Sequence, residues 1–235
     1  MSSDRLLYRD PVQSRSLVGG VLLLLTLLSG CSDVPEIVDG GVSIPGVGSM
    51  FTTQVVQQVG ADSPPVQTSM KFSVQVTDMI MEGKERVVQF AADTLVTLIA
   101  YETNGDLSLY MEPGAFGRCP VSAGWLRVPF GGEADVNDTL LTTEDCILVW
   151  SARPLGVESV IINGLSLKTQ KVVAELRADE LGEEAGFRCR KYTLWYAPEL
   201  GYVVREHLIG LEGDNEQVDT IGTSQRELSE YTLKK

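Results

Sequence analysis

Alternation of apolar and polar residues recurs along most of this chain. In the segment from Met70 to Thr77 every second residue is apolar, a pattern typical of a β-strand with one face on a core and the other in water. Similar segments follow at intervals of roughly ten residues, separated by Gly, Pro, Asn and Asp. The other expected strands are Phe51 to Val59, Glu85 to Ala91, Leu95 to Thr103, Gly105 to Met111, Trp125 to Phe130, Ile147 to Ser151, Val157 to Ile162, Leu165 to Leu176, Tyr192 to Tyr196, Gly201 to Gly210 and Glu227 to Lys234.

These segments predict an all-β domain made of one curved antiparallel sheet, half-barrel or sandwich-like in form, with little helix beyond the N-terminal segment. Asn104-Gly105 lies between two expected strands and predicts a type I′ hairpin turn, in which both central residues have positive φ. The charged segment Ala178 to Gly186 is interpreted as an exposed acidic loop with room for one helical turn.

The N-terminal segment combines Arg5, Arg9 and Arg15 with an apolar run from Leu17 to Leu28, which is too short to remain as a membrane-spanning helix. The run ends in Leu28-Ser29-Gly30-Cys31, which resembles the lipobox of bacterial lipoproteins. That resemblance implies cleavage before Cys31, a diacylglycerol on its sulfur, an acyl chain such as palmitate on its new N-terminus, and anchorage in a membrane. A buried core helix and a plain secretory signal cleaved elsewhere remain the alternatives.

Three regions follow from this interpretation. Residues 1–30 form a signal peptide, residues 31–48 a flexible tether rich in Pro and Gly, and residues 49–235 a single β domain. Ser32 after the anchor cysteine resembles the enterobacterial signal for sorting to the outer membrane, although Asp33 weakens that signal. The expected location is therefore the cell envelope, with the domain facing the periplasm or the cell surface.

The formal net charge of −13 disfavours nucleic acid as a partner, because an acidic surface repels phosphate backbones. The negative charge also disfavours peripheral binding of the domain to anionic lipid headgroups. The acyl chains on Cys31 are therefore the expected membrane contact.

The cysteines at positions 119, 146 and 189 are odd in number, which in an oxidising compartment indicates one disulfide and one buried thiol, or no disulfide. Cys119 lies in a loop-like segment and Cys146 opens an apolar strand, which favours a Cys119–Cys146 pair, although spacing leaves the connectivity open. No Cys-x-x-Cys pair or neighbouring histidine supports a metal site.

Catalytic motifs are absent from the sequence. His207 is the one histidine and shares a strand face with Arg205, so it is interpreted as a solvated strand residue. No Gly-x-Ser-x-Gly motif and no phosphate-binding glycine loop occur. We therefore expect no enzymatic activity and no cofactor.

The segment Tyr192 to Glu206 contains the sequence Trp195-Tyr196-Ala197-Pro198 and is followed by a strand from Glu227 to Leu233. Together they resemble the hairpin and closing strand of TapB-like envelope proteins, a family of largely unknown function. Pro198 and Gly201 independently predict a hairpin, which places Trp195 and Tyr196 on opposite faces of their strand.

Two functions of different class are consistent with these features. Curved antiparallel sheets resemble the half-barrel of the periplasmic carriers that ferry lipoproteins, which implies an apolar ligand or lipid held on one face of the sheet. The candidate ligand-binding residues are Phe72, Val74, Val76, Leu107, Leu109, Trp125 and Trp195. The alternative is an interaction or assembly lipoprotein that contacts another envelope protein through a sheet edge or loop surface.

Overall fold

The structure is a computed structural model and describes residues 37–38, 42–60, 62–132, 134–182, 185–214 and 217–234. The chain divides into two compact units, Met1–Ser32 and Asp33–Lys235. All described residues belong to the second unit. This unit contains the disulfide and the hydrophobic core, so we expect it to fold without the first unit. Cys31 and the expected signal peptide lie outside the described residues.

The described residues contain sixteen strands and no helix, which confirms the prediction of an all-β domain with a curved antiparallel sheet. None of the described residues forms a helix of the length and apolar character that crossing a membrane requires. The strands are β1 Ile37–Val38, β2 Val42–Ser43, β3 Met50–Val59, β4 Val66–Met81, β5 Lys84–Ala92, β6 Leu95–Tyr101, β7 Leu107–Met111, β8 Gly114–Phe116, β9 Cys119–Val121, β10 Gly124–Val128, β11 Val136–Thr142, β12 Cys146–Ile162, β13 Leu165–Glu180, β14 Gly186–Ala197, β15 Tyr202–Gly213 and β16 Val218–Thr232.

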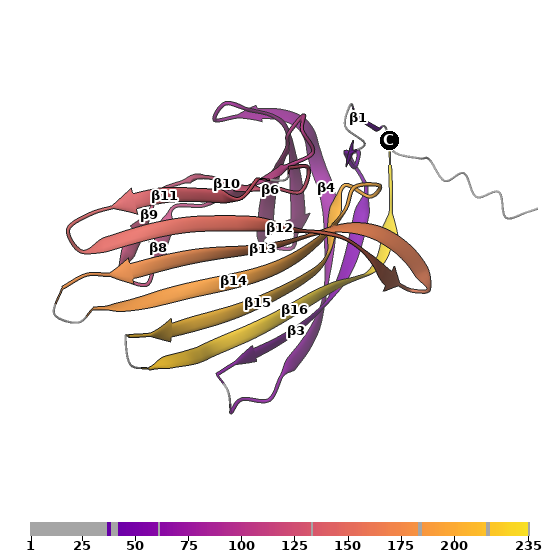
Figure 1. Cartoon of the computed structure of the whole chain (residues 1–235). Helices are drawn as coiled ribbons and strands as arrows, with labels where there is room; N and C mark the ends of the chain where they lie inside the picture. Colours follow the sequence, from indigo (N-terminus) through magenta and orange to yellow (C-terminus); the bar gives the residue numbers. More distant parts are fainter. Residues whose placement is uncertain are drawn as a thin grey trace, which may run out of the picture. The chain divides into compact units, whose positions relative to one another are not determined.

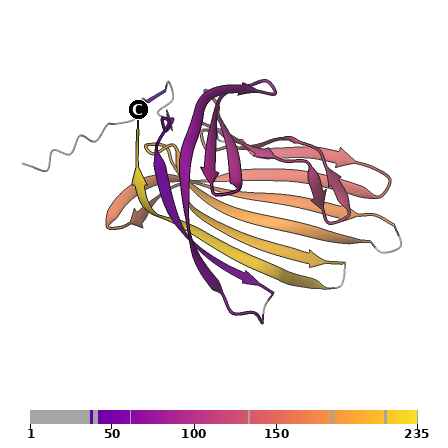
Figure 2. The same ribbon diagram turned by 180° about the vertical axis from the view of Figure 1, so that it is seen from behind.

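Within the described residues, twelve strands form one sheet in the order β10-β7-β6-β5-β4-β3-β16-β15-β14-β13-β12-β11. The sheet curves strongly, and its β10 end approaches β12 near the other end (Figures 1 and 2). The indole Nε1 of Trp150 in β12 donates a hydrogen bond to the carbonyl oxygen of Arg127 in β10, at 2.8 Å. Side chains on the inner face of the sheet therefore surround a common interior.

Aromatic side chains from several strands pack together in the interior. Phe51 of β3 stacks on Tyr202 of β15 with ring centroids 4.1 Å apart, and Phe90 of β5 lies 5.6 Å from the same ring. The hydroxyl of Tyr101 donates a 2.6 Å hydrogen bond to the carbonyl oxygen of Gly201. Burial of such rings contributes about 2 kcal/mol each, and these contacts hold the two halves of the sheet together.

The segment from Val42 to Gly48 packs against the sheet, although the sequence assigns it to the tether. The amide of Ser43 donates to the carbonyl oxygen of Pro198 at 2.8 Å, and both Val42 and Ser43 are buried. A Cβ on Gly201 would lie 2.1 Å from the carbonyl oxygen of Ser43. The close approach of the two backbone segments at this point therefore requires glycine. The segment from Val42 to Gly48 thus packs on the β domain.

Two local expectations were wrong. Strand β13 continues to Glu180, because Ala178 points inward and is fully buried, so the connecting loop is much shorter than Ala178 to Gly186. At Asn104-Gly105 only the glycine has positive φ. The side-chain oxygen of Asn104 accepts the amide of Asp106 at 3.1 Å, which produces a wider loop than a type I′ turn.

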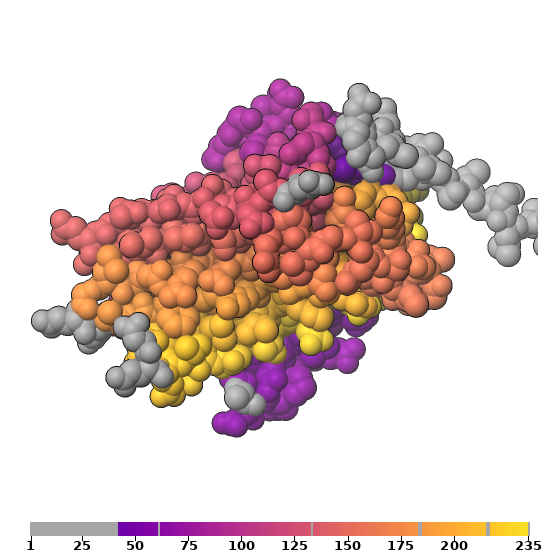
Figure 3. All heavy atoms as spheres, viewed as in Figure 1, coloured from indigo at the N-terminus to yellow at the C-terminus, as the bar shows by residue number. Residues whose placement is uncertain are grey.

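The end of the β12–β13 hairpin crosses the outer face of the sheet. A register shift lies between Pro154 and Gly156, and beyond it Glu158 accepts a hydrogen bond from the indole of Trp195 in β14. The side-chain amide of Asn163, at the tip, donates to the carbonyl oxygen of Ser229 in β16. Figure 3 shows the outer surface formed by β12 to β16, with this hairpin at its right-hand end. Trp195 is consequently covered on the outer side.

Candidate functional site

An interior cavity of about 540 Å³ lies between the two halves of the curved sheet. Strands β4 to β7 and β10 line one side of it, strands β12 to β16 line the other, and the small hairpin β8–β9 borders it. Its apolar lining includes Phe72, Phe90, Leu109, Leu126, Trp150 and Leu194. A largely apolar cavity of this volume is in the usual range for small-molecule sites, so it is the candidate ligand-binding site.

Strand alternation explains how the chain builds the lining. In β14, Arg190, Tyr192 and Leu194 occupy every second position and all line the cavity. The intervening residue Lys191 forms a 3.5 Å ion pair with Glu175 on the outer face. The same period of two that predicts a strand therefore places one charged, one aromatic and one aliphatic side chain along the cavity.

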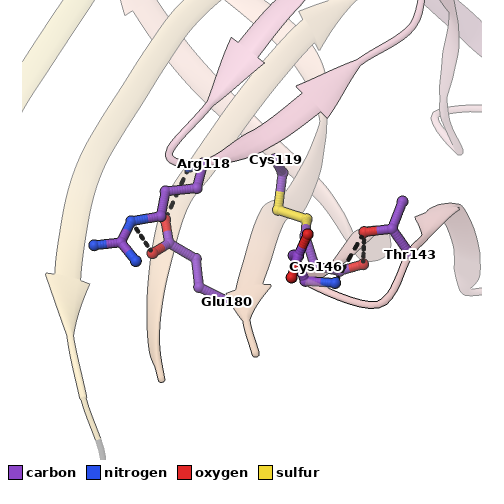
Figure 4. Close-up of a disulfide and its surroundings, with 6 residues drawn as sticks. Arg118, Cys119, Thr143, Cys146 and Glu180 are labelled. Atoms are coloured by element: carbon purple, nitrogen blue, oxygen red, sulfur yellow. Dashed lines mark hydrogen bonds and ion pairs between the residues drawn. A yellow bond between two sulfur atoms is a disulfide. The ribbon is translucent and has the colours of Figure 1, made fainter. Parts of the chain in front are cut away.

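A disulfide holds the β8–β9 hairpin in place beside the cavity. Cys119 of β9 is bonded to Cys146, the first residue of β12, with Cα atoms 5.6 Å apart. Next to it, the amide of Arg118 donates to Glu180 Oε1 at 2.9 Å, and the Arg118 guanidinium lies 3.4 Å from Oε2 (Figure 4). Phe116 of this hairpin lines the cavity, so the disulfide fixes part of the cavity wall.

Charged groups also reach the lining. Arg226 of β16 forms a 2.6 Å ion pair with Glu206 of β15, and its guanidinium lies 5.9 Å from the ring centroid of Phe72. Burial would lower the pKa of Arg226, whereas Glu206 and then Tyr202 raise it, and the net direction is upward. The arginine therefore remains charged within the apolar lining, paired with a carboxylate.

A second arginine lies at the exposed part of the lining. The guanidinium of Arg190 lies 5.1 Å from the ring centroid of Phe116, and Tyr192 lies two residues further along the same face of β14. Burial raises the pKa of Tyr192, and Arg190 acts in the opposite direction. The neutral phenol and the cation thus share one region of the cavity wall.

The residues predicted to bind a ligand separate into several places. Phe72 and Leu109 line the cavity, while Trp125 lines a smaller pocket of about 80 Å³ beside β11. Val74 and Leu107 are buried in the core. Val76 is 39% exposed, because a register shift between Val74 and Val76 changes the pairing of β4 with β5.

Trp195 lies on the opposite face of the sheet from the cavity. Its ring contacts the Nζ of Lys171 at 4.8 Å and the guanidinium of Arg205 at 5.7 Å, and its centroid lies 4.9 Å from that of His207. The hydrogen bond from Trp195 lowers the pKa of Glu158. His207 is half-buried, and burial together with Arg205 lowers its pKa. Tyr196, by contrast, is buried on the inner side against Phe130.

Sequence reasoning missed the charged members of the lining, because it assigned charged strand residues to the solvated face. A usable signal was present for two of them. Arg190 precedes Tyr192 and Leu194 at alternate positions, and Arg226 precedes the buried Leu228 in the same way. Among the described residues, no group of three or more His, Cys, Asp or Glu side chains is arranged to hold a metal ion.

No family model matches the chain, and no curated protein matches it. Two solved structures show a weak likeness. A candidate lipoprotein from Parabacteroides distasonis has a TM-score of 0.43 and 11% sequence identity, covering 84% of this chain and 100% of its own. The hypothetical lipoprotein YmcC from Escherichia coli has a TM-score of 0.33 and 11% identity, covering 77% of this chain and 84% of its own.

Proposed function

We propose that this protein binds an apolar small molecule or lipid chain in the cavity of its curved sheet, without catalysing a reaction on it. The observation that carries the proposal is the 540 Å³ cavity with its aromatic and aliphatic lining. A solid core would have left no room for a ligand, whereas a volume of several hundred cubic ångströms accommodates one. The proposed role is that of a carrier or receptor for apolar molecules in the cell envelope.

The ligand test uses the Asp33–Lys235 unit, exported to an oxidising compartment and analysed by native mass spectrometry and lipid extraction. A co-purifying apolar molecule is expected. Leu109→Trp, which places a larger side chain in the lining, should reduce its occupancy severalfold. Trp195→Phe is the matched control, because Trp195 lies on the outer face. An empty and stable unmodified protein, which also takes up no added lipid, would contradict the proposal.

The second part of the proposal is that Cys31 carries acyl chains that anchor the domain in the envelope, in the outer membrane. Its support is the sequence Leu28-Ser29-Gly30-Cys31 after an apolar run. Cells expressing the full chain should incorporate labelled palmitate into the protein, and Cys31→Ala should abolish the label. Membrane fractionation of the same cells tests the outer-membrane location, and label retained in Cys31→Ala would exclude this attachment site.

The proposal also relates this protein to the TapB-like envelope proteins. Its support is the sequence motif of the hairpin from Tyr192 to Glu206, which resembles the hairpin of that family.

A second candidate function has one observation in its favour. The β12–β13 hairpin exposes four apolar side chains, Leu155, Val157, Ile161 and Leu165, which are 48%, 59%, 67% and 54% exposed. Val157 and Ile161 share the face that points away from buried Val160 and Ile162. Such groups often mark protein contact sites, which suggests an assembly lipoprotein. Crosslinking of intact envelopes should then recover one reproducible partner that is lost in Val157→Ser/Ile161→Ser. Recovery of the same partner by the double variant would contradict this candidate.

A further inference from the structure

The charges in the cavity lining are not equivalent. Arg226 is neutralised by Glu206 at 2.6 Å, whereas Arg190 has no carboxylate within ion-pair distance among the described residues. Its guanidinium lies over the ring of Phe116, and Tyr192 is its neighbour on the same strand face; neither carries a negative charge that would cancel that of Arg190. A cation thus lies at the exposed part of an apolar cavity, in a protein whose formal net charge is −13.

The contact with Phe116 supports the guanidinium of Arg190 but provides no acceptor for its N–H donors. A guanidinium has five N–H donors in a planar fork that matches a carboxylate or a phosphate. The Phe116 ring lies against the guanidinium, and Tyr192 lines the cavity beside it. Because both neighbours line the same cavity, the remaining donors are available to a group entering with a bound ligand.

Glu112 also lines the cavity and is exposed. Its negative charge would favour a cationic ligand instead of an anionic one. Its position follows β7, on the half of the sheet opposite to Arg190 of β14. The nearby hydroxyl of Tyr110 has its pKa raised by burial, by Glu82 and by Glu112. A cationic ligand would need Glu112 as its partner, and dodecylamine, a cationic probe of the same chain length, tests this alternative.

We infer that the ligand is an anionic amphiphile, with its single apolar chain in the cavity and its carboxylate or phosphate group bound by Arg190. This inference rests on the proposed function. It predicts that binding depends on the charge of the headgroup as well as on the length of the chain. The partner chemistry is that of a fatty acid or of a phosphate monoester of a long-chain alcohol.

The test measures the affinity of the Asp33–Lys235 unit for four ligands of equal chain length by titration calorimetry at low salt. They are laurate, dodecyl phosphate, dodecanol and dodecylamine. We expect the two anions to bind about tenfold more tightly than dodecanol, as a charge-assisted hydrogen bond at a partly exposed site would give. A preference between the two anions distinguishes a fatty acid from a phosphate ester.

Variants locate the effect. Arg190→Gln should remove the advantage of the anions over dodecanol, and Arg190→Lys should retain part of that advantage. Arg177→Gln is the matched control, since Arg177 also lies over a phenylalanine ring, that of Phe187, but on the outer face and paired with Asp179. Circular dichroism checks that each variant is folded.

Three outcomes would overturn the inference. Equal binding of laurate and dodecanol would remove the role of charge while leaving the proposed function intact. Tightest binding of dodecylamine would reverse the sign of the headgroup and assign the site to Glu112. Failure of all four ligands to bind would remove the proposed function together with the inference that rests on it.

Discussion

Asp106 lies in the interior of the protein, with 0% exposure. Its Oδ1 accepts the amides of Gly131 and Gly132, each at 3.0 Å, and its Oδ2 accepts Nε of Arg127 at 2.8 Å. A buried carboxylate is tolerated only when its oxygens are satisfied in this way. The side chain therefore joins the β6–β7 loop to the segment that follows β10.

Replacing Asp106 by Asn should destabilise the protein by about 3 kcal/mol, because an amide cannot accept at both ends and leaves Arg127 without its partner. Urea unfolding measures this free energy. Asp138→Asn is the control: Asp138 is an exposed carboxylate on β11, and its replacement should change stability by less than about 0.5 kcal/mol. Equal effects of the two substitutions would refute this role for Asp106.

Cys189 should be inert in the folded protein. Burial, and then the carboxylate of Glu175, raises the pKa of its thiol from 9.0 to about 11. The thiolate population near pH 8 is thereby reduced about a hundredfold, and burial further restricts access. In the Asp33–Lys235 unit, Ellman's reagent should react with Cys189 only after urea is added, and fast reaction without urea would contradict the assignment.

The same shift links Cys189 to stability. Since the folded-state pKa lies above the unfolded value, the folded state favours the protonated thiol. That contribution is complete below about pH 9 and is lost as the pH rises through about 11. Cys189→Ser should flatten this alkaline decline in unfolding free energy.

Two of the long hairpins turn through loops of only two residues. Glu82-Gly83 joins β4 to β5, and Asn163-Gly164 joins β12 to β13; all four residues have positive φ. Asn tolerates this conformation, whereas Glu is strained in it by about 1 kcal/mol. The two turns have the same geometry, but one of them carries an unfavourable residue.

Glu82→Asn should therefore stabilise the protein, by about 1 kcal/mol. The loss of the exposed 3.3 Å hydrogen bond from Tyr110 to Glu82 offsets only a small part of this gain. Thermal unfolding monitored by circular dichroism would detect the change. Tyr110→Phe serves as the control for that bond, and a Glu82→Asn variant less stable than the original would contradict the turn assignment.

At the scale of the whole molecule, apolar alternation was sufficient to predict the sheet but not its interior. The pattern from Met70 to Thr77 marks a strand with two faces. It does not reveal the register shift after Val74, which leaves Val76 exposed. The alternation also does not show that Arg190 lies on the cavity side of its strand. The cavity side is determined by the curvature of the whole sheet, which encloses one of its two faces.

The disulfide between Cys119 and Cys146 joins the β8–β9 hairpin to β12. Replacing both cysteines by Ser should lower stability by about 3 kcal/mol, as expected for a closed loop of this length, with a sequence separation of 27. Urea unfolding with and without a reductant provides the measurement. The reductant should weaken the original protein and leave the double variant unchanged; the opposite result would exclude a structural disulfide.

The pairing of β3 with β16 places strands from the two ends of the described domain side by side in the middle of the sheet, with Phe51 opposite Tyr231. Neither half of the sheet can be joined to the other until β16 is available. Contacts of such large sequence separation form slowly. A chain that is still being synthesised must therefore remain incompletely folded until β16 has emerged, and a chaperone that shields exposed strands would act during that interval.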